Sequence, residues 1–363
     1  MVPNKEELFS ILRAAGHQPL VVASEAGASI LLLPHGGRIL GLFSESSGTN
    51  FLWTNPVLAD AATAKEYLSS DDWHNSGGDR TWLAPEVDFF FPNFPDIGTY
   101  FQPRDLDPGN YQVLDQEFSS DAHPTCAIRN ELQLALKRSG QQYDMRITKI
   151  VGVVSNPLPD MGIEASNHRL EFAGYRLQTS LEILNTDSLI NGDSQSYVGV
   201  WNLLQLPHGG EMLLPTYCRS EPTTFFGEIP TKDLQVEDRL IRYKMRARGE
   251  QKISVHALAS TGRAGYLFRQ GEEFCLVVRS FGIDLSGKYV DVWGTRLEDS
   301  GYVFQACNIN SKLGSFSELE YHAPAIGGNT GHLRSDDVSV VWAFRGAKQA
   351  IQQAANLILG KVE

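Results

Sequence analysis

The residues best suited to chemistry lie in one short segment near the C-terminus, residues 315 to 328, which begins SFSELEYH. If residues 316 to 322 form a strand, successive side chains alternate between its two faces, so Glu318, Glu320 and His322 share one face. Carboxylates that lie close together raise one another's pKa, which tunes a carboxyl group for general acid or base catalysis. The pattern predicts a catalytic face, and a solvated strand face is the structural alternative.

A second stretch, GGDRTWLAPEVDFFFPNFPD at residues 77 to 96, combines ionisable groups with many aromatic rings. Sugar rings stack their C–H faces on aromatic side chains, and their hydroxyls pair well with arginine and carboxylate groups. The substrate-binding residues predicted in this stretch are Asp79, Arg80, Trp82 and Glu86. The structural alternative is that the rings close one end of the protein and that Asp79 and Arg80 form a local ion pair.

This stretch is predicted to be a long loop. Gly77, Gly78 and Pro85 disfavour regular structure, and a strand is expected to resume at residues 87 to 91. Binding and catalytic residues concentrate on loops that a rigid scaffold positions.

Two helices are predicted, one at each end of the chain. Asn4 can cap a helix over about residues 4 to 15, and Gly360 follows a second apolar pattern over about residues 347 to 359. The residues between them are expected to form strands and loops.

The strands carry a period-two pattern. Apolar and polar side chains alternate at residues 175 to 183, 145 to 151 and 338 to 344, and turn residues recur between such segments. No composition shift or repeat marks a boundary in the 363 residues. The sequence predicts one all-β domain over residues 1 to 363, an antiparallel super-sandwich at about 20 to 345 with peripheral terminal helices.

Composition narrows the range of partners. The chain has 42% hydrophobic residues and a net charge of −12, so it is expected to fold and to repel nucleic acid and anionic membrane surfaces. No signal peptide or long apolar segment is seen, so we expect a soluble, cytoplasmic protein. The four cysteines lack metal or redox spacing and are expected to be buried free thiols. Neither a metal nor a cofactor is predicted.

Four short motifs occur in a characteristic order along the chain: GASILLLPHGGRILGLF, GGDRTWLAPE, SYVGVWNLLQLP and SELEYHAPA. Together they resemble the galactose mutarotase-like superfamily, and most closely its uncharacterised branches. The resemblance spans about residues 20 to 345. It implies a large antiparallel β super-sandwich whose concave face binds a sugar.

The aldose 1-epimerases of that superfamily interconvert sugar anomers. A glutamate removes the anomeric hydroxyl proton and a histidine protonates the ring oxygen, which opens the ring. By resemblance, the base is Glu320 and the sugar-orienting arginine is Arg80, while Trp201 and Asn202 belong to the mid-chain motif and are expected to contact substrate.

One feature of the superfamily is missing. Its catalytic histidine lies a few residues before the aromatic-Asn-Leu motif, and here those positions are Tyr197, Val198 and Gly199. The histidines that could substitute are His322, His74 and His208, whereas His35 lies in a Pro-His-Gly-Gly turn and is expected to be structural.

Three functions remain open. The first is an aldose 1-epimerase-like isomerase with Glu320 as base, and the second is a protein that binds a sugar without chemistry. A third, polysaccharide lyase activity, is disfavoured because the chain is acidic and lacks a helical domain ahead of the sandwich.

Overall fold

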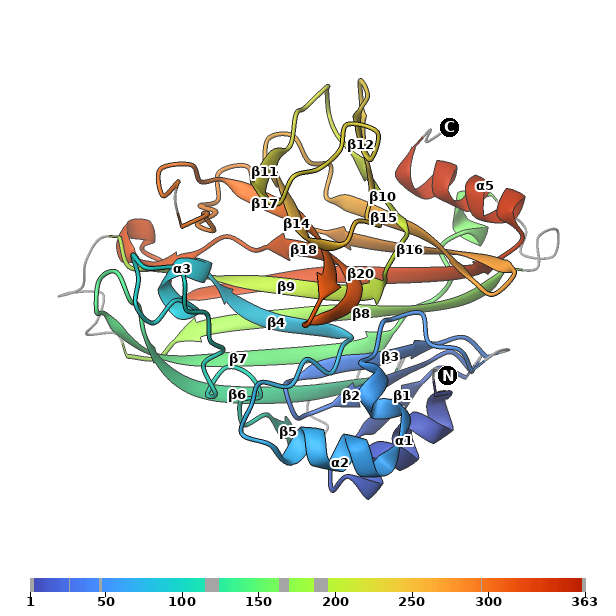
Figure 1. The fold of residues 1–363 in the computed structure, drawn as a ribbon, viewed down its shortest axis with the longest axis horizontal. Helices are drawn as coiled ribbons and strands as arrows, with labels where there is room; N and C mark the ends of the chain where they lie inside the picture. Colours follow the sequence, from blue (N-terminus) through green and yellow to red (C-terminus); the bar gives the residue numbers. More distant parts are fainter. Residues whose placement is uncertain are drawn as a thin grey trace.

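The protein is built from two ten-stranded antiparallel sheets. Figure 1 shows the computed structural model, which describes residues 3–25, 27–45, 48–114, 124–162, 170–185, 195–294 and 296–360. The first sheet contains, in spatial order, β1 (Leu20–Ala23), β2 (Ser29–Leu33), β3 (Arg38–Phe43), β4 (Asp79–Ala84), β9 (Tyr197–Pro207), β18 (Gly314–His322), β17 (Tyr302–Ser311), β14 (Gly249–His256) and β11 (Thr223–Phe226). The short β19 (Ile326–Gly327) also pairs with β9.

The second sheet packs against the first. Its strands are, in spatial order, β12 (Leu234–Val236), β13 (Leu240–Lys244), β10 (Glu211–Pro215), β15 (Arg263–Gln270), β16 (Glu273–Phe281), β20 (Arg334–Gly346), β8 (Glu171–Ile183), β7 (Gln142–Val153), β6 (Thr125–Ala135) and β5 (Gln112–Leu114). The three alternating segments predicted from the sequence lie in β7, β8 and β20, which are neighbours in this sheet. The all-β super-sandwich prediction is confirmed.

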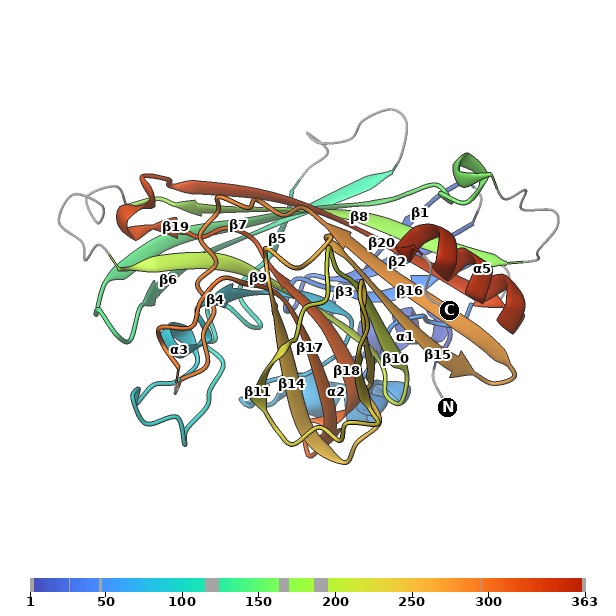
Figure 2. The same cartoon turned by 90° about the horizontal axis from the view of Figure 1, so that it is seen from above.

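Both terminal helices are confirmed. The first, α1 (Lys5–Ala14), begins with a capping box in which Asn4 and Glu7 exchange backbone-to-side-chain hydrogen bonds. The last, α5 (Lys348–Leu359), packs its apolar side on the outer face of β15, β16 and β20, as Figure 2 shows. Short 3-10 segments occur at Pro56–Ala59, Pro159–Met161 and Gly328–Thr330.

One helix was not predicted. Residues Ala61–Ser69 form α2, which Asp60 caps by accepting hydrogen bonds from the backbone of residues 62 and 63. Its buried apolar side consists only of Ala64 and Leu68, which gives too short a pattern to detect in the sequence. Both α1 and α2 pack on the outer side of β2 and β3.

The prediction for residues 77 to 96 was wrong in two respects. Residues 79 to 84 form β4, a central strand, and the expected strand at 87 to 91 is replaced by a short helix, α3 (Glu86–Phe89). The glycines serve a close approach between backbones: Gly77 and Gly78 have positive φ, and a Cβ at either would lie within 2.3 Å of a backbone oxygen. These glycines let the chain pass close to the backbone of Trp53 and Ile39, so it enters the sheet as β4 instead of forming a loop.

A buried ion pair joins the two sheets. Asp79 of β4 accepts hydrogen bonds from Arg279 of β16, at 3.1 Å, and from the hydroxyl of Tyr175 of β8, at 2.6 Å. Both side chains of the ion pair are fully buried. Nearby, the hydroxyl of Tyr321 donates to Asp337, so the core contains an interconnected polar network surrounded by apolar side chains.

The cysteine prediction is confirmed only in part. All four thiols are free, and Cys275 and Cys307 are buried, but Cys126 is half-buried and Cys218 is exposed. None of the described helices has the length and apolar character needed to cross a bilayer.

The buried ion pair gives a stability prediction. Arg279→Met should lower the free energy of unfolding by about 3 to 5 kcal/mol, because it leaves a buried carboxylate without its cation. Arg334 forms an exposed ion pair with Asp336, so Arg334→Met should cost less than about 1 kcal/mol. Urea unfolding at neutral pH measures both, and equal losses in the two variants would contradict the assigned role of the buried pair.

Candidate functional site

Strand alternation gathers polar side chains on the face of the first sheet that points away from the second. Registered pairing places Trp82 beside Trp201, and His322 beside Trp201 from the other side. We call this surface the polar face, and its residues are Arg80, Trp82, Trp201, Gln205, Lys252, Gln305, Cys307, Glu318, Glu320 and His322. They come from five adjacent strands, β4, β9, β18, β17 and β14.

Two ion pairs organise the polar face. Arg80 binds Glu318 at 3.0 Å, and the Gln205 amide donates to the same carboxylate oxygen at 3.0 Å. Lys252 binds Glu320 at 2.9 Å. The indole of Trp201 donates to the same Glu320 oxygen at 2.8 Å, so each carboxylate has one cationic and one neutral donor.

Aromatic rings surround these charges. The Arg80 guanidinium lies 4.2 Å from the ring centre of Trp82, and the Lys252 ammonium lies 4.6 Å from that of Trp201. His322 stacks on Trp201 with ring centres 5.6 Å apart. The two cation–ring contacts hold Arg80 and Lys252 in place, because the face of an aromatic ring attracts a positive charge.

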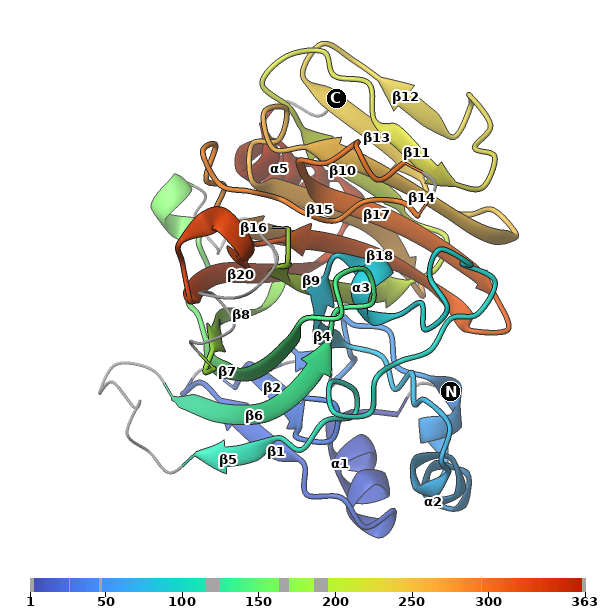
Figure 3. The same cartoon turned by 90° about the vertical axis from the view of Figure 1, so that its left-hand side faces the viewer.

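Segments from two other parts of the chain cover the polar face. Figure 3 shows α3 lying in front of β4, β9 and β18. Glu86 of α3 is buried and accepts a hydrogen bond from the Tyr100 hydroxyl at 3.0 Å. Asp291 accepts from the backbone of Glu86 at 2.9 Å and from Gln305 of the polar face at 2.8 Å, which ties the two covering segments to the sheet.

Burial sets the protonation of the two central carboxyl groups. It raises the pKa of Glu320 to about 7, helped by Glu318 and opposed by Lys252. Burial also raises the pKa of Glu86 to about 7, opposed by Lys252 and helped by Asp291. Both groups therefore titrate near neutral pH.

The pKa values of His322 and Lys252 shift in opposite directions. Burial lowers the pKa of His322 to about 4, so its imidazole is neutral at physiological pH. For Lys252 burial alone would lower the pKa, but Glu320, Glu86 and Asp291 outweigh it and raise the pKa above its ordinary value. Lys252 thus stays charged.

Several buried polar atoms on the polar face have no hydrogen-bond partner within the described part of the chain. They are Nε and Nη1 of Arg80, both ring nitrogens of His322, and the amide oxygens of Gln205 and Gln305. Buried polar groups are nearly always satisfied in folded proteins, by protein atoms or by ordered water, so these donors and acceptors are available to water or to a polar ligand.

The structure brings together most of the residues predicted from the sequence. Glu318, Glu320 and His322 share one face, as expected, but they are buried, so the solvated alternative is wrong. Arg80, Trp82, Trp201 and Glu86 lie in the same cluster.

Four residues singled out from the sequence lie elsewhere. Asp79 and Asn202 point into the core between the sheets, where Asn202 donates to the Tyr321 hydroxyl at 2.8 Å. The suggested ion pair between Asp79 and Arg80 is therefore wrong, since adjacent strand residues point to opposite faces. His74 is bonded to His35 at 3.1 Å and to Ser70, apart from the polar face. His208 bonds to Asn308 and lines a different cavity.

Sequence reasoning missed Lys252, Gln205, Gln305, Asp291 and Tyr100. The available signal was weak: Lys252 and Gln205 lie in segments, KISVH and NLLQLP, that mix apolar residues with other polar ones. Polar residues at buried strand positions need partners, but the sequence does not say which strands adjoin.

Among the described residues one group of ligand atoms is close enough to hold a metal ion. Atoms of Cys307, Glu318 and Glu320 lie within 4.8 Å of one another. The arrangement does not fit a cation, because Arg80 and Lys252 already bind the two carboxylates. Burial also raises the pKa of Cys307, which keeps it a thiol.

Comparison with known families gives one match. The profile of a family of unknown function, DUF6786, matches residues 9–362. The chain belongs to this family. A search of the curated proteins finds no match to this chain.

Solved structures with a similar fold are galactose mutarotase-like proteins. One from Clostridium acetobutylicum has 10% identity and a TM-score of 0.48, covering 90% of this chain and 95% of its own. One from Lactobacillus casei has 9% identity and a TM-score of 0.47, covering 90% and 100%. A galactose 1-epimerase from Lactobacillus acidophilus has 7% identity and a TM-score of 0.39, covering 90% and 94%.

Glu86 gives a prediction about pH. Because the folded state raises the pKa of this carboxyl from 4.5 to about 7, it binds the proton more tightly than the unfolded chain, so its contribution to stability falls as pH rises through that interval. Glu86→Gln keeps an acceptor for Tyr100 and should remove from the stability profile a decline of up to about 1.4 kcal/mol per pH unit in this interval. Urea unfolding at a series of pH values measures this, with the exposed Glu66→Gln as control. Parallel profiles for wild type and Glu86→Gln would contradict the pKa assignment.

Proposed function

We propose that the polar face binds a sugar and interconverts its anomers by general acid and base catalysis. The observation that carries the proposal is the cluster of unsatisfied buried polar atoms beside two carboxyl groups that titrate near pH 7. A sugar supplies many hydroxyls that both donate and accept, which suits unsatisfied arginine, imidazole and amide groups at the same time.

Binding would rest on Arg80 and the tryptophans. The free Nε and Nη1 of Arg80 can donate to ring hydroxyls while its Nη2 stays bound to Glu318. Trp82 and Trp201 lie with ring centres 5.6 Å apart in an edge-to-face arrangement and offer apolar surface for the C–H side of a sugar.

Catalysis would divide between Glu320 and Glu86. Glu320, as carboxylate, takes the proton of the anomeric hydroxyl, and Glu86, as carboxylic acid, gives a proton to the ring oxygen as the bond from that oxygen to the anomeric carbon breaks. Rotation of the resulting aldehyde and ring closure, with both proton transfers reversed, gives the other anomer. Two carboxyls with a pKa of about 7 are each present in both forms at neutral pH, as the two directions require.

The neutral His322 would have a different role from that of the superfamily's histidine. With its pKa near 4 it carries no proton to give as imidazolium at neutral pH, but its ring nitrogens can orient a hydroxyl. Glu86 therefore suits the acid role better than His322.

Entry of a sugar would require the cover to move. Glu320 is 1% exposed, Arg80 3% and Glu86 8%. Displacement of α3 and the loop that carries Tyr100 would open the polar face and, on closing, would exclude water from the reaction.

The second candidate is sugar binding without chemistry. It is favoured by the two hydrogen bonds that already occupy one oxygen of Glu320, from Lys252 and Trp201, because these stabilise the carboxylate and weaken it as a base.

The two candidates differ in anomer exchange. Proton NMR saturation transfer between α and β signals of a panel of free aldoses should show acceleration by the wild-type protein. Glu320→Gln should lower the rate by about a hundredfold or more while sugar affinity changes only a few-fold. Glu66→Gln on α2 serves as control and should leave the rate unchanged.

Other outcomes separate the possibilities. Saturable binding of an aldose with no acceleration would establish the binding function. Full activity in Glu320→Gln would exclude it as the base, and absence of both binding and exchange would overturn the proposal.

A further inference from the structure

A second cavity lies on the opposite side of the molecule from the polar face. It has a volume of about 600 Å³ and is bounded by α5 and by β10, β13 and β15 of the second sheet. Its sheet residues include Glu211, Arg242 and Leu267, which point outward because their neighbours Met212, Ile241 and Tyr266 belong to the core. We call this cavity the basic cleft.

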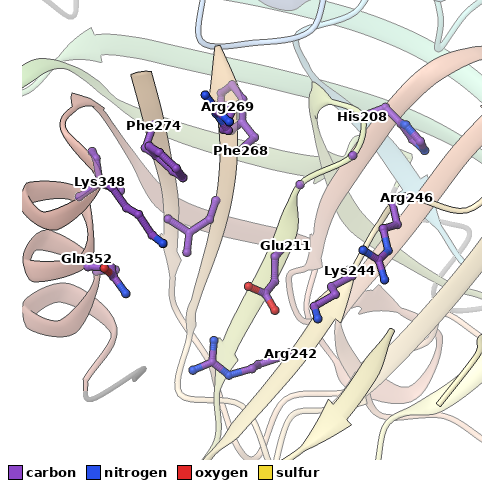
Figure 4. A pocket seen from close by; sticks show the side chains of 15 residues that line it. His208, Glu211, Arg242, Lys244, Arg246, Phe268, Arg269, Phe274, Lys348 and Gln352 are labelled. Carbon is purple, nitrogen blue, oxygen red and sulfur yellow. The ribbon is translucent and has the colours of Figure 1, made fainter. Parts of the chain in front are cut away.

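Basic side chains dominate the cleft. Figure 4 shows Lys348 and Gln352 extending from α5 on one side, the side chains of the sheet and its adjoining loop on the other, and Glu211 between them. The five basic residues are Arg242, Lys244, Arg246, Arg269 and Lys348, and the one acidic residue is Glu211. This concentration of positive charge occurs in a chain with a net charge of −12, so composition does not account for it.

The carboxylates of the protein neutralise this charge only in part. Arg242, Arg246 and Arg269 each pair with a carboxylate that does not line the cleft, at 2.8, 2.5 and 3.6 Å. Lys244 and Lys348 form no ion pair within the described ranges. The ammonium groups of Lys244 on β13 and Lys348 on α5 therefore line opposite walls of the cleft without a paired carboxylate, although Glu211 lies opposite Lys244 in the β10–β13 ladder.

Two details concern the cations at the helix side of the cleft. The guanidinium of Arg269 and the ammonium of Lys348 lie 5.3 and 5.8 Å from the ring centre of the same residue, Phe274. Lys348 also begins α5, whose N-cap residue Ala347 makes no side-chain capping bond and whose first turn has no acidic residue. A cation at a helix N-terminus is electrostatically unfavourable, and a bound anion would offset that unfavourable interaction.

We propose that the basic cleft is a binding site for a small molecule that carries two or more phosphate groups. A single phosphate could not contact Lys348 on the helix and Lys244 on β13 together with the arginines between them, because these residues line different walls. Arginine forks and lysine ammonium groups are the usual phosphate ligands. The apolar part of the lining, which includes Leu267, Ile351 and Ala355, offers contact for the carbon skeleton of such a ligand.

The cleft is suited to a soluble ligand and not to a membrane. Lys244 and Glu211 are half-buried in the concave region between α5 and the sheet, where the headgroups of a flat bilayer would not reach both walls. The site is separate from the polar face, so its ligand need not be the sugar proposed to bind there.

Calorimetric titration of the full-length protein with inorganic pyrophosphate tests this site. We expect saturable binding that weakens as salt concentration rises, and weaker binding of inorganic phosphate. Lys244→Gln and Lys348→Gln should each weaken pyrophosphate binding by about tenfold, the effect of one lost charged hydrogen bond. Glu211→Gln should strengthen binding, because it removes the acidic group of the cleft.

Lys65→Gln on the exposed side of α2 is the matched control and should bind pyrophosphate as the wild type does. All four substitutions are at partly or fully exposed positions, so folding is expected to persist. Absence of saturable binding, or binding that is equally strong in Lys244→Gln, Lys348→Gln and the control, would overturn the proposal. Binding of vesicles that contain anionic phospholipid, lost in the same two variants, would also overturn it and assign the cleft to a lipid surface.

Discussion

The alternation of side chains along the central strands of the first sheet is the constraint on which the rest of the structure depends. In β4, Asp79 points toward the second sheet and meets Arg279, while Arg80 points the other way and meets Glu318. Two adjacent charged residues thus serve two unrelated purposes, cohesion of the sandwich and construction of the polar face. A shift of the pairing by one residue would exchange these environments, so the register of β4 on β9 must be held tightly.

The buried charges of the polar face are tolerable because they compensate one another. Arg80 and Lys252 balance Glu318 and Glu320, and aromatic rings lie against both cations. Desolvation of such groups costs several kcal/mol each, and an interior made of apolar residues of similar volume would often be as stable. Retention of so many charged groups in one buried cluster therefore favours a role in binding or chemistry over a role in stability alone.

The same alternation operates on the second sheet. In β10 and β13 it sends Met212, Leu214, Ile241 and Tyr243 to the core and leaves Glu211 and its basic neighbours on the outer face, where α5 completes a cleft. The helix covers apolar side chains of this face along most of its length, and its N-terminal turn adds a cation at the edge. The polar face and the basic cleft consequently lie on opposite outer surfaces of the sandwich, separated by its core.

Local periodicity and capping residues were enough to predict the fold class, the two terminal helices and the common face of Glu318, Glu320 and His322. The sequence also singled out Arg80, Trp82, Trp201 and Glu86 as candidates, and the structure places these four in one cluster. It misjudged residues 77 to 91, where glycines admit a strand beside another backbone and a proline precedes a helical turn, since those effects depend on neighbours far away in the chain. Tertiary structure alone decided that Lys252 pairs with Glu320, that Asp79 and Asn202 belong to the core, and that basic residues from a helix and several strands meet in one cleft. Each of these outcomes requires strand order and register, which no local pattern in the sequence encodes.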